Sequence, residues 1–196
     1  LPYSTKKNPG AITRRHIIID HARADGIVNL ISLVGGKLTT FRHAAQQVVD
    51  AADSKASATS PACATDTVPL WGGAMQDVES FVASEFGRAH QRWKIDDVTF
   101  RHLVTLYGTH YHEVLDLAGS HPGGFEKVCS HGVDINAQII YAVRHEWAKT
   151  LADVMLRRTP IGMNTCLGMD ACEIAADLMA AELGWNAENR HREIAA

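Results

Sequence analysis

The sequence predicts a mostly α-helical protein in which a strand–strand–helix segment precedes a helical domain. Apolar residues recur three and four positions apart from residue 75 onward, whereas short β-branched runs lie before residue 35. A stretch rich in Ser, Thr and Ala separates these two regions. We therefore expect an incomplete first domain over residues 1–53, a linker over 54–72 and an all-α C-terminal domain over 73–196.

The first domain begins with two predicted strands. Residues 15–20 and 30–34 are short apolar runs, and Asp25-Gly26 between them is a turn signal, so the strands can form an antiparallel pair. A helix from about Thr39 to Ala52 follows, because its apolar residues have helical spacing. Two strands and one helix bury too little of their own faces. We therefore expect a further segment to complete this domain.

The C-terminal domain is predicted to contain several amphipathic helices in succession. The first carries apolar residues from Met75 to Phe86, and the second begins at the cap Asp96 and ends at Gly108. Three more are expected: a short helix over 111–118, a long one over 134–158 with a break near Glu146, and a last one over 169–183 that ends at Gly184.

Composition excludes several classes of function. Of the 196 residues, 46% are hydrophobic and 21% are charged, which is ordinary for a globular protein. The formal net charge of −3 gives no reason to expect nucleic-acid binding. No apolar run reaches the roughly 18 residues that a transmembrane helix needs.

Histidines and cysteines are present, but their spacing predicts no metal site. His110 and His112 lie near a helix start, where side chains two positions apart diverge. Cys129 and His131 have no second ligand pair at a zinc spacing. The four cysteines form no CxxC pair, so we expect reduced thiols rather than a disulfide scaffold.

The junction between the second strand and its helix is the most informative feature for function. Gly35 and Gly36 can adopt positive φ angles and allow close approach of a ligand. Lys37 supplies a positive charge, and the N–H groups of a first helical turn favour a phosphate or another anion. Thr39 and Thr40 are candidate caps or ligand-binding residues. On spacing alone, a plain strand–helix turn is the alternative.

Two sequence runs resemble a known family, the FAD-dependent, quinone-linked glycerol-3-phosphate dehydrogenases. Residues 13–21 together with GGKLTTFR at 35–42 are similar to the end of the family's flavin domain. YAVRHEWA at 141–148 and LADVMLRRT at 151–159 are similar to its most recognisable helical segment. The resemblance covers nearly the whole chain in order and spacing.

The resemblance implies a site and an activity. In this family, FAD oxidises sn-glycerol 3-phosphate to dihydroxyacetone phosphate, and the electrons pass to a quinone. Arg14 and Lys37 would hold the substrate phosphate, with Arg15 as the alternative to Arg14. The residues that would pass beside the flavin are Gly35, Gly36, Lys37, Leu38 and Thr39. No catalytic residue is assigned.

The same resemblance implies a location and partners. The full-length protein would be cytoplasmic and peripheral to the inner membrane, and its partners would be glycerol 3-phosphate, a quinone and, as a candidate assembly, a second copy in a homodimer. The GxGxxG fingerprint that would follow a first strand is absent from this sequence. We therefore expect this chain to be a C-terminal fragment that alone neither holds FAD nor turns over substrate.

Two alternatives are open at this point. The chain could instead be a stand-alone helical interaction or docking module, with residues 1–53 as a vestigial arm. It could also be part of a related glycerol-3-phosphate oxidase, which passes electrons to oxygen rather than to a quinone.

Overall fold

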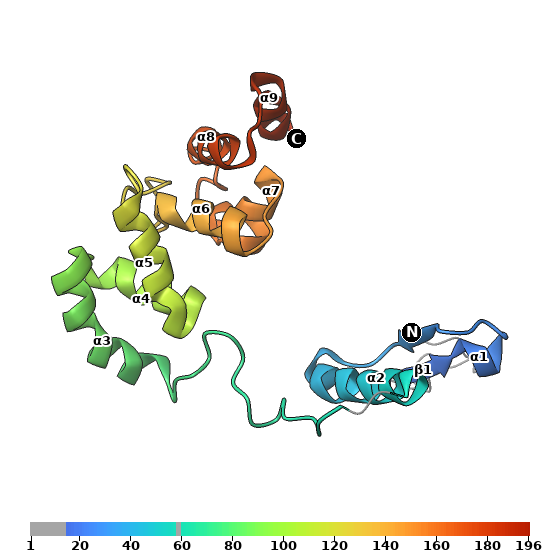
Figure 1. The fold of residues 1–196 in the computed structure, drawn as a ribbon. Helices are drawn as coiled ribbons and strands as arrows, with labels where there is room; N and C mark the ends of the chain where they lie inside the picture. Colours follow the sequence, from blue (N-terminus) through green and yellow to red (C-terminus); the bar gives the residue numbers. More distant parts are fainter. Residues whose placement is uncertain (1–14, 58–59) are drawn as a thin grey trace. The chain divides into compact units, whose positions relative to one another are not determined.

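The computed structural model describes residues 15–57 and 60–196 (Figure 1). Contacts divide the chain into two compact units, and the division falls between Pro69 and Leu70, inside the segment 54–72. The first unit holds a two-stranded sheet and a long helix, and the second is built of helices. The predicted fold class, mostly helical with a small strand remnant near the N-terminus, is confirmed.

The two predicted strands pair in the first unit. β1 (Ile17–Asp20) and β2 (Ile31–Val34) are antiparallel, with Ile17 opposite Val34 and Asp20 opposite Ile31. The connection contains a short helix, α1 (His21–Ala24), which the sequence analysis did not predict. Asp20 begins this helix by accepting a hydrogen bond from the Ala22 N–H at 3.0 Å.

The long helix of the first unit begins and ends later than predicted. A 3-10 turn, η2 (Leu38–Thr40), leads into α2 (Phe41–Ala56). The sequence analysis placed the end near Ala52, but the helix continues until Ser57 adopts a left-handed conformation with φ 51°. Lys55 in this added turn pairs with Asp20 at 2.7 Å, so the extra length attaches α2 to β1.

Three helices form the first core of the second unit. They are α3 (Val78–Trp93), α4 (Asp97–Tyr107) and α5 (Tyr111–Ser120), and they pack around Phe100, Leu103 and Leu115. Asp77 and Asp96 cap α3 and α4 by accepting hydrogen bonds from the N–H groups of Ser80 and Thr99. The predicted cap Asp96 and the predicted end at Gly108 are both confirmed.

A second core surrounds the remaining helices. The predicted break near Glu146 separates α6 (Asn136–His145) from a short α7 (Leu151–Asp153), which continues into a π-helical turn, η4 (Val154–Arg158). After the 3-10 turn η5 (Ile161–Met163) come α8 (Cys172–Leu183), which ends at Gly184 as predicted, and α9 (Ala187–Ala195). The sequence analysis did not predict α9, because its face is polar and carries few apolar residues.

The backbone at the end of α4 passes very close to the backbone at the start of the second unit. The two segments meet at Gly108 and Gly72. Gly108 has φ +57°, and a Cβ added to it would lie 1.9 Å from the carbonyl oxygen of Gly72. Gly72 has φ +77°, and a Cβ there would lie 2.6 Å from the Tyr107 carbonyl oxygen. The Thr109 N–H donates to the Gly72 carbonyl at 3.0 Å, which fixes the crossing.

We expect Gly108→Ala to destabilise the second unit by about 2–4 kcal/mol, because the new Cβ meets backbone in a conformation that L side chains rarely adopt. Thermal unfolding followed by circular dichroism measures this. The matched control is Gly87→Ala in α3, where a Cβ meets nothing within 4 Å. The control should be neutral or stabilising by about 0.5–1 kcal/mol. Equal melting temperatures for the two variants would contradict the tight crossing.

Candidate functional site

The predicted glycine–lysine junction is formed directly after β2. Gly35 and Gly36 both have positive φ, 75° and 100°, the conformation that the sequence analysis considered open to them. A Cβ on Gly36 would lie 3.2 Å from the Cβ of His16, which precedes β1. The antiparallel register therefore places His16 beside the end of β2.

The first turn after the glycines differs from the predicted one. Thr40 occupies the N-cap position of α2, but its side chain makes no capping hydrogen bond. Its hydroxyl instead donates to the Lys37 carbonyl at 2.9 Å, and its N–H donates to the same oxygen at 3.0 Å. Thr39 lies inside the 3-10 turn rather than at a cap. Thr39 is therefore not a cap, because the 3-10 turn displaces the helix start to Phe41. Thr40 has the predicted N-cap position but not the capping bond, because its hydroxyl is engaged with the Lys37 carbonyl.

The side chains of this junction are open to solvent. All residues from Gly35 to Thr40 are exposed, and Leu38 retains 88% of its accessible surface. Within residues 15–57 and 60–196, the Lys37 ammonium has no ion-pair partner. The segment therefore offers a cation and unprotected backbone, which are the groups that an anionic ligand needs.

The predicted second phosphate ligand is not positioned by the structure. Arg14 lies outside the described residues, and its alternative Arg15 is the first residue inside them, with an exposed side chain. The register places Arg15 and His16 at the same end of the hairpin as Gly36. The pairing of an arginine with Lys37 thus stays a prediction.

The second unit contains a polar network that the sequence analysis did not find. Glu113 accepts hydrogen bonds at 2.6 Å from the Tyr141 hydroxyl and from His110 Nδ1. These bonds hold the pKa of Glu113 below its ordinary value, with the Tyr141 bond as the larger cause. The His110 ring also stacks on Trp71 with centroids 4.1 Å apart. His110 is thus engaged in packing and pairing.

A half-buried carboxyl group lies beside this network. Glu146 Oε2 is buried without a hydrogen-bond partner, and so is the Tyr107 hydroxyl. Burial raises the pKa of Glu146, and the charge of Arg158 partly opposes this effect. A hollow of about 360 Å³ is lined by five residues: Trp71, Glu113, Tyr141, His145 and Glu146. No sequence pattern signalled it, since its residues come from separate segments.

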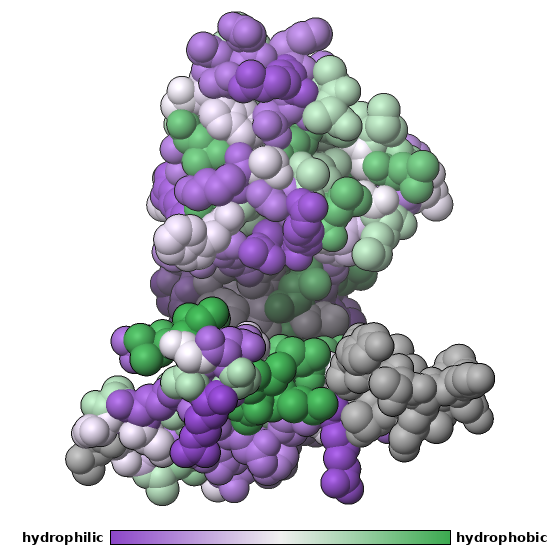
Figure 2. Space-filling model, turned by 90° about the vertical axis from the view of Figure 1, so that its right-hand side faces the viewer, coloured by the Kyte–Doolittle hydropathy of each residue, from purple (hydrophilic) through white to green (hydrophobic). Residues whose placement is uncertain are grey.

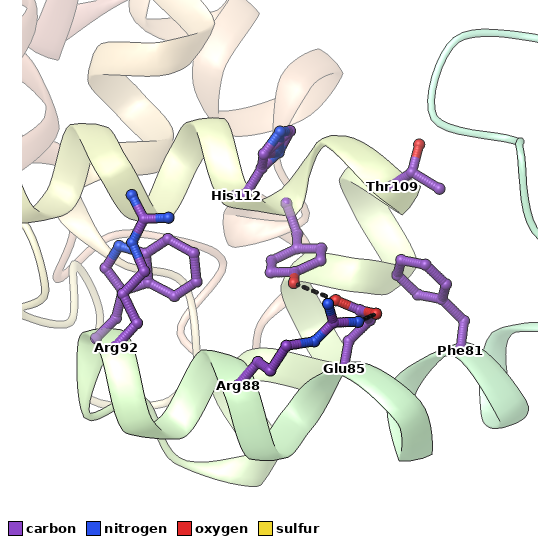
Figure 3. Close-up of a pocket in the computed structure, with 8 residues that line it drawn as sticks. Phe81, Glu85, Arg88, Arg92, Thr109 and His112 are labelled. Atoms are coloured by element: carbon purple, nitrogen blue, oxygen red, sulfur yellow. Dashed lines mark hydrogen bonds and ion pairs between the residues drawn. The ribbon is translucent and has the colours of Figure 1, made fainter.

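A larger hollow of about 460 Å³ lies along α3 and the start of α5 (Figure 3). Glu85 pairs with Arg88 and accepts a hydrogen bond from the Tyr111 hydroxyl at 3.1 Å. Arg92 pairs with Asp116 at 2.7 Å and lies over the Trp93 ring. Because Glu85, Arg88 and Arg92 already have ion-pair partners, we assign no ligand to this hollow.

Comparison with known proteins assigns the family. The model of the C-terminal domain of alpha-glycerophosphate oxidase matches residues 63–190. The chain belongs to this family. The predicted resemblance is therefore confirmed, and the matched residues begin just before the second unit and extend into α9.

Relatives align along nearly the whole chain but over a minor part of their own length. A glycerol-3-phosphate dehydrogenase of Synechocystis sp. is 37% identical over 196 residues, covering 99% of this chain and 34% of the relative. The aerobic glycerol-3-phosphate dehydrogenase of Escherichia coli is 30% identical over 161 residues, covering 80% of this chain and 30% of the relative. The chain thus spans about a third of these curated relatives.

A solved structure is similar to this chain and supports the same family. The X-ray structure of the glycerol-3-phosphate dehydrogenase from Bacillus halodurans, complexed with FAD, matches with a TM-score of 0.69 and 28% identity. The match covers 85% of this chain and 34% of that chain.

We expect Glu146→Gln to change the pH dependence of stability. Burial raises the pKa of this carboxyl in the folded state above its pKa in the unfolded state. The wild-type chain therefore loses stability as the pH rises from the unfolded-state pKa through the folded-state pKa. The variant has no such ionisation, so its free energy of unfolding relative to wild type should increase from pH 4 to pH 8. Urea unfolding across this pH range measures the difference. Glu188→Gln, at an exposed position in α9, is the control and should show no such trend. A parallel pH profile for Glu146→Gln and wild type would refute the buried ionisation.

Proposed function

We propose that this chain is the C-terminal part of a flavin-dependent glycerol-3-phosphate dehydrogenase. The observation that carries the proposal is the family match over residues 63–190. Support also comes from relatives that are named glycerol-3-phosphate dehydrogenases and align over nearly the whole chain. A stand-alone docking module is disfavoured, because the alignment includes the glycine–lysine junction as well as the helical domain.

The junction after β2 fits a backbone segment that passes beside a flavin. Two successive glycines with positive φ leave one side of the chain without side chains, and Lys37, Leu38 and Thr39 that follow are exposed. A bound FAD would supply the acceptor for the hydride on the carbinol carbon of glycerol 3-phosphate. The role of this chain is then to line the flavin and to position the substrate.

Lys37 is proposed to hold the phosphate of the substrate together with Arg14. A lysine gives a point charge and an arginine can bind two phosphate oxygens at once, so the pair suits a phosphate dianion. The open ammonium of Lys37 supports this role, as does the position of His16, two residues after Arg14 in the sequence, beside Gly36. Arg15 is the alternative arginine.

In the full-length protein, Lys37→Ala should raise the KM for glycerol 3-phosphate by about 10- to 100-fold, the scale of one charged hydrogen bond. Steady-state kinetics with an artificial electron acceptor measure it. Lys149→Ala removes the same charge from the second unit, where the ammonium lies 5.9 Å from the Trp147 ring centroid, and should leave KM unchanged. The isolated 196-residue chain with added FAD serves as the blank, without turnover. An unchanged KM in Lys37→Ala would remove the lysine from the site and leave the family assignment intact.

Association with a membrane and transfer of electrons to a quinone are further parts of the proposal. In the part of the chain that the structure describes, no helix is long and apolar enough to span a bilayer. Apolar surface in Figure 2 forms separate patches among polar surface. In the second unit, exposed apolar side chains around η5 suit a peripheral contact with lipid: Leu156, Met163, Leu167 and Met169. We propose a cytoplasmic protein that is peripheral to the inner membrane, with a homodimer as its candidate assembly.

The oxidase alternative has one observation in its favour, the description of the matching family as part of alpha-glycerophosphate oxidase. The relatives named above are dehydrogenases, and we therefore expect a quinone to be the acceptor. Turnover of the full-length protein should reduce a soluble quinone analogue at least ten times faster than it produces hydrogen peroxide in air, a difference of about 1.4 kcal/mol in barrier. Equal peroxide formation with or without the quinone would establish the oxidase.

A further inference from the structure

Four metal-ligating side chains converge in the second unit, from two segments that are far apart in the sequence. The Cys129 and Cys166 sulfurs are 3.3 Å apart, although 37 positions separate the residues. Asp170 Oδ1 accepts from the Cys129 thiol at 3.2 Å and from the Cys166 thiol at 2.7 Å. His131 Nδ1 lies 3.0 Å from Asp170 Oδ2. One potential ligand atom from each residue lies within 4.8 Å of all the others.

The backbone holds the first ligand pair in place. Lys127 and Ile135 form an isolated antiparallel bridge, so the residues between them form a closed loop that carries Cys129 and His131. Cys129 is buried in the second core, whereas the His131 side chain is 52% exposed. The His131 N–H donates to the Cys129 sulfur at 3.3 Å, so the loop itself holds these two residues against each other.

The second ligand pair is carried by a tight turn. Leu167 and Gly168 have positive φ angles, 52° and 74°, and the Met169 N–H donates to the Cys166 carbonyl at 3.0 Å. This turn brings Cys166 and Asp170 to the same side. A Cβ on Gly168 would lie 2.5 Å from the Met155 side chain, so glycine allows the turn to pack against η4.

We propose that this cluster is a structural zinc site with four protein ligands: Cys129, His131, Cys166 and Asp170. Two sulfurs, an imidazole nitrogen and a carboxylate oxygen form a tetrahedral set of the kind that Zn²⁺ binds. In such a site, neighbouring ligand atoms lie about 3.4–3.8 Å apart. The four contacts among these side chains, between 2.7 and 3.3 Å, are shorter than this, and all four ligand atoms lie within 4.8 Å of one another, so we expect the side chains to adjust when the ion binds. Both thiols release their protons to water on binding.

The position of the cluster indicates what the ion does. Between Arg158 and Cys172, η5 is three residues long and the chain is otherwise irregular. A zinc ion would join this segment to the loop before α6 and thereby stabilise the second core around it. The Ser130 hydroxyl, which donates to Asp170 Oδ2 at 2.9 Å, would orient the carboxylate as an outer partner. The proposal does not depend on the proposed flavoenzyme activity.

The test is metal binding by the full chain, purified under reducing conditions and freed of metal by dialysis. Co²⁺ titration should give a one-to-one complex with sulfur-to-metal charge transfer and the strong visible absorption of tetrahedral cobalt, and Zn²⁺ should displace it. Removing a residue that only hydrogen-bonds to a metal ligand typically weakens metal binding by about 10- to 100-fold. Cys166→Ser and His131→Gln each remove a ligand itself, so each should weaken Zn²⁺ binding by more than about 100-fold.

The control is Cys63→Ser, which removes an exposed thiol from the other unit and should keep wild-type affinity. Circular dichroism checks that each variant is folded, and the half-exposed His131 provides the variant least expected to disturb the core. Three results would each overturn the proposal. They are weak octahedral cobalt spectra, equal loss of affinity in Cys63→Ser, and a Cys129–Cys166 disulfide that forms in air despite added zinc.

Discussion

Burial of α6 on all sides is the constraint on which the second unit depends. Every residue from Asn136 to Val143 is buried, which is the pattern of a central helix rather than of a surface helix. One part of the helix, including Tyr141, contributes to the first core, and another part, including Ile139, to the second. At its start, the buried Asp134 is bonded to Gln138 and to His102, whereas the buried Oδ1 of Asn136 has no partner among the described residues. The two cores are therefore coupled through one helix.

The first unit has the opposite property. Ala44 is its one fully buried apolar residue among those that the structure describes, whereas Leu38, Phe41 and Val49 each expose more than half of their surface. Exposed apolar surface of this extent usually marks a contact with another protein segment. The proposed function explains it, because the remainder of a flavin domain would cover the sheet and α2. The glycine–lysine junction is part of this exposed surface, so the same segment would cover it.

Local signals predicted most of the fold, and long-range contacts account for what they missed. The cap Asp96, the ends at Gly108 and Gly184 and the break near Glu146 each follow from a few adjacent residues. The π turn was not predicted, because Thr159 bonds the Val154 carbonyl through both its N–H and its hydroxyl, and apolar spacing does not report such bonds. The cluster of Cys129, His131, Cys166 and Asp170 was not predicted for a similar reason. The sequence analysis considered only ligand pairs that are close in sequence, and this cluster joins two distant segments. For residues 35–39, the sequence indicated the positive φ angles of the two glycines. That these residues contact a flavin and that Lys37 contacts a phosphate stay predictions.

The strongest family signature and the proposed chemistry lie in different units. LADVMLRRT is occupied with local structure: Asp153 accepts hydrogen bonds from the N–H groups of Lys149 and Thr150, and these bonds lower its pKa to about 2. Arg157 pairs with the same carboxylate at 2.9 Å. This run therefore determines where α7 begins and where η4 ends, and both pack against the second core. The lysine proposed to bind the substrate phosphate, Lys37, lies in the first unit. A recognisable motif identifies the family here because it specifies a fold, and the function has to be sought at the site.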